Sequence, residues 1–279
     1  MWHRNGLSIV LSTHAAQFSA LAYQGDLEAN IARIAGMGYD GVELAIRDPA
    51  QVDVGKLEAI LVAHGMKVPA IGTGQAWGEE HLSFTDPDPA VRRSAVERIA
   101  SHIQLARRLE ALVIIGLIRG VTAAGVSGQQ SMQWLEECVG ECVERAAEQG
   151  VRLAMEPLNR YETDLVTNVE AGLDLVRRMG SPYFGLLLDT FHMNIEEPSI
   201  EGSIAAAGEA IFHFHVADSN RWNPGAGHLD FRSIFEALKR TGYPGWISGE
   251  FMPLPDADRA AQGSIDYLRG VLGGNPTGR

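Results

Sequence analysis

Cysteine is scarce in this chain. The 279 residues contain two, Cys138 and Cys142, which stand four positions apart in a stretch with helical periodicity. Two thiols alone do not complete the four-ligand set of a structural zinc site. We therefore expect both to be small buried apolar residues of a protein from a reducing compartment.

Long hydrophobic runs and an excess of positive charge are also missing. No apolar stretch approaches the roughly 20 residues that a membrane-spanning helix needs. The first apolar run, Leu7–Ser12, is too short for a signal peptide, and Met1–Gly6 lacks its clustered positive charge. Lys and Arg number 23 against 35 Asp and Glu, a formal net charge of −12. This balance disfavours nucleic acid as a partner. We expect a cytoplasmic protein without membrane partners, and a homo-oligomer is compatible with these properties.

What the chain does contain is an alternation of short apolar runs and longer amphipathic stretches. The expected strands are Leu7–Ser12, Gly41–Ile46, Lys67–Gly72, Leu112–Leu117, Arg152–Glu156, Phe184–Asp189, Phe212–Val216 and Trp246–Phe251. The expected helices are Leu27–Met37, Val54–His64, Pro89–Leu109, Met132–Gln149, Val169–Met179, Phe231–Arg240 and Asp258–Leu272. Asp88 before Pro89 predicts a helix start, and Gly150, Gly180 and Gly242 predict helix ends.

Eight strand–helix units in about 250 residues predict a single (β/α)8 TIM barrel. A doubly wound open sheet is the alternative, but no G-x-G-x-x-G follows the first strand. No Pro-rich or Ser-rich linker divides the chain. We expect one catalytic barrel domain over residues 1–272 and a flexible tail over 273–279.

The last four expected strands each end in a metal-ligating side chain. Glu156, Asp189, His215 and Glu250 are one strand–helix unit apart, and the carboxyl ends of barrel strands meet at one mouth. Strand alternation places these four side chains inward with Ala154 and His213. The residues placed outward are Leu153, Met155, Leu186, Leu188, Phe212, Phe214, Ile247 and Phe251.

Three carboxylates that converge in a barrel mouth would repel one another unless a cation lies between them. Three oxygen ligands and one imidazole suit Mn²⁺ or Mg²⁺ better than zinc. We expect one divalent ion, Mn²⁺ first, with Mg²⁺ and Co²⁺ as alternatives. Its open positions would take vicinal oxygens of a small substrate.

The motifs around these candidate ligands resemble those of a known enzyme family. The runs EPLNRYE from Glu156, LDTFHMNIEE from Leu188 and HFHVADSNR from His213 resemble the xylose-isomerase-like sugar epimerases, whose best-known branch is the D-tagatose/D-psicose 3-epimerases. The resemblance implies that Glu156, Asp189, His215 and Glu250 bind the metal, with Glu156 and Glu250 also exchanging the proton. It further implies that Glu162, His192 and Arg221 hold substrate oxygens.

Three other segments, AIGTGQ from Ala70, VIIGLIRG from Val113 and HVADSNRW from His215, more closely resemble 5-keto-L-gluconate epimerases of inositol catabolism, which yield D-tagaturonate. Asp218 and Arg119 depart from the tagatose/psicose branch and favour a keto-acid over a neutral ketose. Arg119 and Arg47 follow strand ends, where either could pair with a substrate carboxylate, and Gln75 could reach the substrate. For Arg47 a structural ion pair, for instance with Asp48, is the competing interpretation.

Other functions stay open at this point. Aldose–ketose isomerisation needs the same metal and a proton moved between neighbouring carbons. Metal-dependent abasic-site endonucleases share the fold, but they use a cluster of three metals and a basic surface. A non-catalytic sugar-binding module could keep the pocket, although the presence of both Glu156 and Glu250 favours an enzyme.

Overall fold

The computed structural model describes residues 5–273, and its strands form one parallel sheet. The tail expected from residue 273 begins at the glycine that caps the last helix, and its remaining residues lie outside the described part. The strands are β1 (Leu7–Ser12), β2 (Tyr23–Gln24), β3 (Gly41–Ala45), β4 (Ala70–Gly72), β5 (Leu112–Ile115), β6 (Leu153–Met155), β7 (Phe184–Asp189), β8 (Ile211–Val216) and β9 (Ile247–Gly249).

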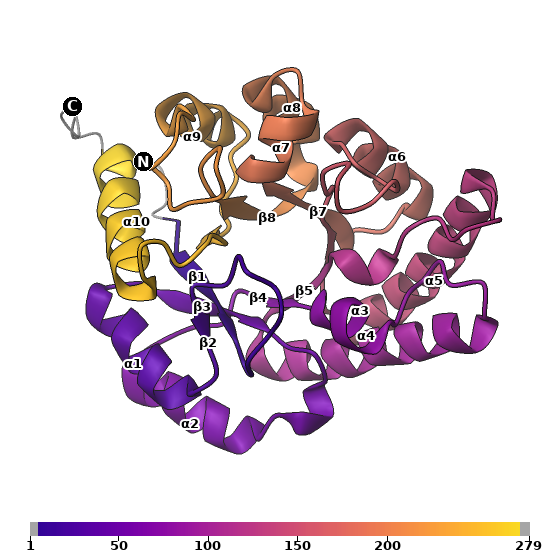
Figure 1. The fold of residues 1–279 in the computed structure, drawn as a ribbon, viewed down its shortest axis with the longest axis horizontal. Coiled ribbons are helices and arrows are strands. Elements are labelled where there is room, and N and C mark those ends of the chain that lie inside the picture. Colours follow the sequence, from indigo (N-terminus) through magenta and orange to yellow (C-terminus); the bar gives the residue numbers. More distant parts are fainter. Residues whose placement is uncertain (1–4, 274–279) are drawn as a thin grey trace.

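The sheet closes on itself because β1 pairs in parallel with both β3 and β9. The strands β3 to β9 then follow one another around the ring in chain order. The short β2 adds to β1 outside this ring. The fold is therefore an eight-stranded TIM barrel, seen along its axis in Figure 1.

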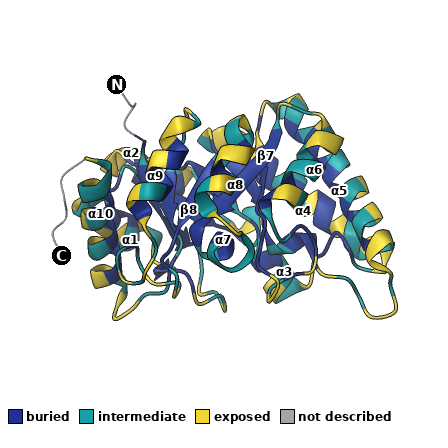
Figure 2. Ribbon diagram, turned by 90° about the horizontal axis from the view of Figure 1, so that it is seen from above, coloured by how far each residue is buried: buried dark blue, intermediate teal, exposed yellow. Residues whose placement is uncertain are grey.

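Helices surround the barrel and turn their exposed sides to solvent, as Figure 2 shows. The α-helices are α1 (Leu27–Met37), α2 (Val54–His64), α3 (Gln75–Glu80), α4 (Pro89–Leu109), α5 (Gly128–Gln149), α6 (Val169–Met179), α7 (Thr190–Glu196), α8 (Ile200–Ala207), α9 (Phe231–Arg240) and α10 (Ala257–Leu272). Short 3-10 turns lie at Pro49–Gln51, Leu117–Arg119 and Gly208–Ala210. Among the described residues, no helix is both long and apolar enough to span a bilayer.

Local sequence signals account for most helix boundaries. Asp88 accepts a hydrogen bond from the backbone N–H of Ala90, and Pro89 follows as the first helical residue. Gly150 and Gly180 adopt the left-handed conformation that ends α5 and α6. Gly242, with φ 76°, follows the end of α9. Cys138 and Cys142 are buried on α5 as free thiols, as expected.

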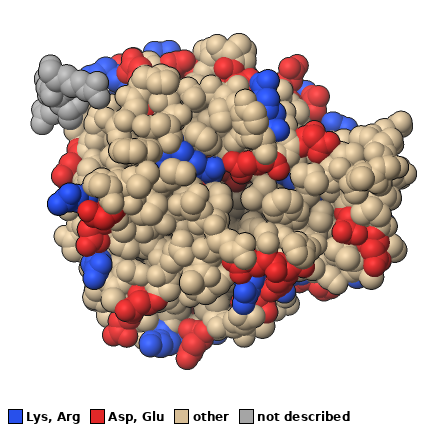
Figure 3. Space-filling view, in the orientation of Figure 1, with Lys and Arg blue, Asp and Glu red and all other residues tan. Residues whose placement is uncertain are grey.

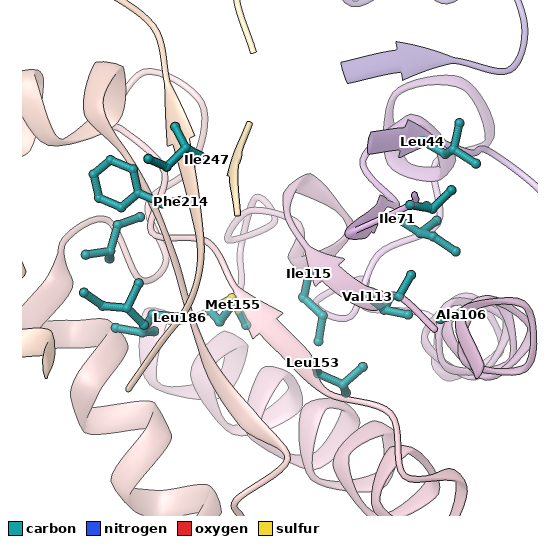
Figure 4. Close-up of a cluster of buried hydrophobic side chains, with 14 of the residues drawn as sticks. Leu44, Ile71, Ala106, Val113, Ile115, Leu153, Met155, Leu186, Phe214 and Ile247 are labelled. Carbon is teal, nitrogen blue, oxygen red and sulfur yellow. The ribbon is translucent and has the colours of Figure 1, made fainter. Parts of the chain in front are cut away.

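The principal core fills the layer between strands and helices. Side chains from successive strands, including Leu44, Val113, Met155 and Phe214, lie there (Figure 4). A second, smaller cluster fills the barrel interior below the mouth, with Ala70, Leu112, Ile114, Ala154 and Leu187 as its members.

The expected orientation of Phe212 was wrong. The pairing of β7 with β8 shifts between Leu186 and Leu187, so that Leu186 pairs with Ile211 and Leu187 with His213. Because of this bulge, Phe212 pairs with no residue of β7, and its ring packs against the barrel-interior cluster. The alternation resumes at His213, so the outward position of Phe214 is confirmed.

Candidate metal centre

The barrel brings the four expected ligands together. Glu156 directly follows β6, Asp189 ends β7, His215 lies near the end of β8, and Glu250 directly follows β9. One ligand atom from each residue lies within 4.8 Å of the others. Glu156, Asp189 and His215 are at most 6% exposed.

The facing atoms of this cluster have no partners among residues 5–273. The Nδ1 atom of His215 lies 3.8 Å from Oε1 of Glu156 and 3.7 Å from Oδ2 of Asp189, beyond hydrogen-bond distance. All three atoms are buried and make no hydrogen bond. Buried polar atoms without partners are costly, and three that converge on one point fit a cation. Carboxylate oxygens and a neutral imidazole are ligands that Mn²⁺ and Mg²⁺ accept, so the residues fit the expected ion.

The electrostatics of the cluster point the same way. Burial, with the charge of Glu250, raises the pKa of Glu156 well above its ordinary value. Burial also raises the pKa of Glu250 to about 7, although His215 and Arg221 oppose the rise. Burial disfavours a charged His215, but the carboxylates of Glu43 and Asp189 outweigh it and raise the pKa of the ring. Without an ion, the raised pKa values mean that Glu156, His215 and Glu250 hold protons more strongly than usual. A divalent cation would displace these protons and supply the positive charge in their place.

The residues expected to bind substrate oxygens surround the cluster. Arg221 donates to Oε1 of Glu162 at 2.9 Å and to Oε2 of Glu250 at 3.2 Å. Nε2 of His192 lies 3.8 Å from Oε1 of Glu156. The opposite ring nitrogen of His192 lies 2.7 Å from the side-chain amide of Asn159, and burial lowers the pKa of His192 to about 4. His192 is therefore neutral at neutral pH.

A cavity of about 270 Å³ opens above the cluster, lined by Glu156, Glu162, His192, His215, Arg221 and Glu250 at one end. Phe18, Leu21, Trp77, Leu117 and Leu158 supply apolar walls, and Gln75 belongs to the same lining. Figure 3 views the molecule from this side, with a hollow near the centre of the face and acidic groups beside it. The size and mixed lining suit a small polar molecule.

The side chain of Gln75 is oriented by a hydrogen bond to Ser12. The hydroxyl of Ser12 donates its hydrogen to the backbone oxygen of His14 at 2.7 Å. Ser12 must therefore accept the 2.8 Å hydrogen bond from Nε2 of Gln75. Oε1 of Gln75 remains buried without a partner in the described chain.

Arg119 does not occupy the position we expected for it. Its guanidinium is fully buried outside the cavity lining and donates to five backbone oxygens, those of Ile115, Gly116, Glu156, Leu165 and Val166. Every N–H of the group is used, so none remains for a substrate carboxylate. The expectation that Arg119 binds substrate is wrong, because the 3-10 turn at Leu117–Arg119 directs its side chain into the loops behind the mouth.

Arg47 and Asp218 also make structural contacts within the protein. Arg47 donates to Glu79 at 2.9 Å and lies 3.2 Å from Glu80, so its ion pair is with these residues and not with Asp48. Asp218 is fully buried and accepts hydrogen bonds from the backbone N–H groups of Ser219, Gly225 and Leu229. Neither residue lines the cavity above the metal cluster.

We expect Arg119→Met to destabilise the fold without changing substrate preference. The loss of five buried donors, two of them on the carbonyls around the left-handed Val166 at φ 55°, should lower the free energy of unfolding by about 2–4 kcal/mol. Chemical denaturation measures this loss. The control Arg108→Met removes an exposed pair with Glu58 and should leave the free energy of unfolding nearly unchanged, because water and salt screen exposed pairs. A selective loss of keto-acid turnover in Arg119→Met would contradict this structural role.

Glu43 is a residue of the site that the sequence patterns did not single out. It lies on β3, is 1% exposed, and is hydrogen-bonded to both His213 and His215. The two imidazoles outweigh the effect of burial and hold the pKa of Glu43 well below its usual range. An acidic residue inside the apolar run GVELA was the available signal, because a charged residue on a buried strand requires partners.

A closed barrel with a buried carboxylate–histidine cluster at its carboxyl mouth defines a metal-dependent TIM-barrel enzyme. A family model described as "Xylose isomerase-like TIM barrel" matches residues 31–271. The chain belongs to this family, and its relatives identify it as a carbohydrate epimerase.

Two relatives are identical to this chain at about a third of the aligned positions. L-ribulose 3-epimerase of Mesorhizobium japonicum is 32% identical over 86% of this chain and 80% of its own. D-psicose 3-epimerase of Ruminiclostridium cellulolyticum is 31% identical over 90% of this chain and 94% of its own. The crystal structure of D-allulose 3-epimerase from Methylomonas sp. in complex with D-allulose superposes with a TM-score of 0.82 at 25% identity, covering 96% of this chain and 97% of that one.

Proposed function

We propose that this protein is a metal-dependent ketose 3-epimerase that acts on a neutral ketose. The observation that carries the proposal is the convergence, beside Glu250, of ligand atoms from Glu156, Asp189 and His215 that have no hydrogen-bond partner in the described part of the chain. The 3-epimerase activities of the relatives support it.

The polar lining of the cavity favours a neutral sugar over a keto-acid. Within residues 5–273, Arg221 is the single Arg or Lys of the lining, and it is already shared by two carboxylates. A substrate carboxylate would meet Glu79 and the acidic cluster without a free cation to offset them. Sugar hydroxyls, in contrast, can donate to Oε1 of Gln75 and to Glu162. These contacts favour the ketose reaction over the 5-keto-L-gluconate reaction that we first expected.

Epimerisation beside a ketone requires removal of a weakly acidic proton and its return to the opposite face. When bound, a divalent ion supplies polarisation of the ketone and stabilises the negative charge that develops on its oxygen. Glu156 and Glu250 come from non-adjacent strands, β6 and β9, so that they can flank a substrate at the cluster. Each carboxylate would act as base in one direction and, once protonated, as acid in the other. Arg221 donates to Glu250, and Nε2 of neutral His192, which makes no hydrogen bond within residues 5–273, lies 3.8 Å from Oε1 of Glu156.

A parallel assay tests the substrate. We expect Mn²⁺-loaded protein to interconvert D-psicose or D-tagatose, or another neutral ketose, with its C3 epimer at a kcat/KM at least about tenfold above that for 5-keto-L-gluconate. Product sugars separated by chromatography measure both reactions. Appearance of an aldose would identify an isomerase instead. A preference for 5-keto-L-gluconate would overturn the neutral-ketose assignment while leaving the epimerase assignment intact.

A further inference from the structure

The buried carboxylate of Glu43 connects two histidines of one strand across the barrel interior. Its Oε2 lies 2.7 Å from Nε2 of His213, and its two oxygens lie 2.9 and 3.0 Å from Nε2 of His215. All three residues are about 1% exposed. Because β3 and β8 are not neighbours in the sheet, this contact crosses the barrel instead of following one strand pair.

Glu43, His213 and His215 could themselves be taken for a second metal site, since their ligand atoms lie within 4.8 Å of one another. These atoms, however, already satisfy each other as hydrogen-bond donors and acceptors. The atoms of the neighbouring cluster that face one another, on Glu156, Asp189 and His215, have no such partners within residues 5–273. We therefore infer that Glu43, His213 and His215 form a hydrogen-bonded group beside the metal site, and that the ion binds at Glu156, Asp189, His215 and Glu250.

The hydrogen bond to Glu43 determines which nitrogen of His215 is available to an ion. A carboxylate accepts hydrogen bonds, so Nε2 of His215 carries the proton of this contact. In a neutral ring, Nδ1 then has its lone pair free, and Nδ1 is the nitrogen that faces Glu156 and Asp189. Carboxylates that fix the tautomer and orientation of a ligand histidine strengthen metal binding.

We propose that Glu43 is the positioning residue of the metal centre, which directs Nδ1 of His215 toward the ion, and that His213 anchors Glu43 from below. This inference rests on the proposed metal-dependent function. It assigns Glu43 no contact with substrate. The neighbour on the same strand, Leu44, faces the outer layer, so Glu43 alone of this pair can take the role.

Direct measurement of Mn²⁺ affinity by titration calorimetry tests the proposal without using turnover. We expect Glu43→Leu to weaken Mn²⁺ binding by roughly 10- to 100-fold. Glu43→Gln should recover part of the loss, because its amide oxygen can still accept from Nε2 of His215. The matched control is Ser248→Ala, which alters a fully buried inward position paired with His215 in the sheet. This control should leave the affinity unchanged.

Two further readouts separate positioning from a general loss of packing. The visible spectrum of bound Co²⁺ should change in Glu43→Leu and not in Ser248→Ala, at a temperature where both remain folded. In wild-type protein with Mg²⁺ bound, a long-range ¹H–¹⁵N spectrum should show the His215 proton on Nε2. That measurement needs no variant and decides the matter even if Glu43→Leu fails to fold.

The outcomes are distinguishable. If wild-type protein binds no divalent metal, the proposed function fails and this inference falls with it. If wild-type protein binds Mn²⁺ and Glu43→Leu binds it equally well, only the role of Glu43 is overturned. A proton on Nδ1 of His215 in the Mg²⁺ form would also overturn it.

Discussion

Glu156→Gln and Glu250→Gln should each lower the rate of ketose epimerisation by about 100-fold or more while retaining the metal. A carboxamide keeps an oxygen near the ion but has no basic site for the proton, and general acid–base catalysis contributes about 10²–10⁴ to rate. Epimerase turnover, together with the metal content of each variant, measures the effect.

The two variants should also separate proton exchange from inversion. Each retains one carboxylate, which can remove a proton from one face of the substrate and return a solvent proton to that same face. In ²H₂O we therefore expect each variant to exchange the C3 proton of one epimer, a different one in each, faster than it forms product.

Glu58→Gln is the matched control, because Glu58 forms an exposed pair with Arg108 on the outside of the molecule. Its turnover should equal that of the wild type. Near-normal epimerisation in both Glu156→Gln and Glu250→Gln, with metal bound, would show that the proton-transfer groups lie elsewhere.

Removal of the divalent ion should abolish turnover and lower the melting temperature. A ligand that binds only the folded state at 100 times its Kd stabilises it by about 2.7 kcal/mol. For a domain of this size, that corresponds to roughly 5 °C. Differential scanning calorimetry of chelator-treated protein with and without added Mn²⁺ measures the shift, and turnover should return with the metal.

The shift should increase with pH. In the metal-free site, burial raises the pKa of Glu250 to about 7, and the pKa of Glu156 is raised as well. Below these values the carboxyls hold protons that an ion must displace, so Mn²⁺ binds more weakly at pH 6 than at pH 8. The melting-temperature increase on adding Mn²⁺ should accordingly be larger at pH 8.

Asp189→Ala provides the control for metal-specific stabilisation. It removes a carboxylate whose pKa is lowered to about 2, despite burial, by its electrostatic interactions with His192, His215 and Arg221. Without this ligand, we expect little Mn²⁺-dependent change in melting temperature at either pH. A full shift in Asp189→Ala would place the stabilising ion at another site.

Position along the chain was sufficient to predict the arrangement of the metal cluster. Glu156, Asp189, His215 and Glu250 stand at equivalent ends of successive strands, and parallel barrel strands deliver such positions to one mouth. The same reasoning failed for Phe212, because a bulge adds a residue to β8 that alternation cannot reveal. It also missed α3, α7 and α8, which are short helices within the loops after β4 and β7.

The contacts of Arg119 could not be predicted from the sequence. Its position after a barrel strand was compatible with a carboxylate anchor, and only the path of the loops revealed that five carbonyl groups occupy its guanidinium. A backbone oxygen is present at every residue and has no signature in the sequence. The proposal of a neutral ketose as substrate thus rests on which cations remain uncommitted in the described cavity lining, and this is a property of the folded loops.

By itself, then, the sequence determined the barrel, most of its strand and helix boundaries and the convergence of four candidate ligands at one mouth, since these depend on hydrophobic periodicity, caps and regular spacing along the chain. The tertiary structure decided the contact of Glu43 with His215, the burial of Arg119 among backbone carbonyl groups and the lack of an uncommitted Arg or Lys in the described cavity lining. Each of these depends on contacts between residues far apart in sequence, such as Glu43 and His215, 172 positions apart. Local patterns do not encode which distant polar groups meet, because that is fixed only when the barrel closes.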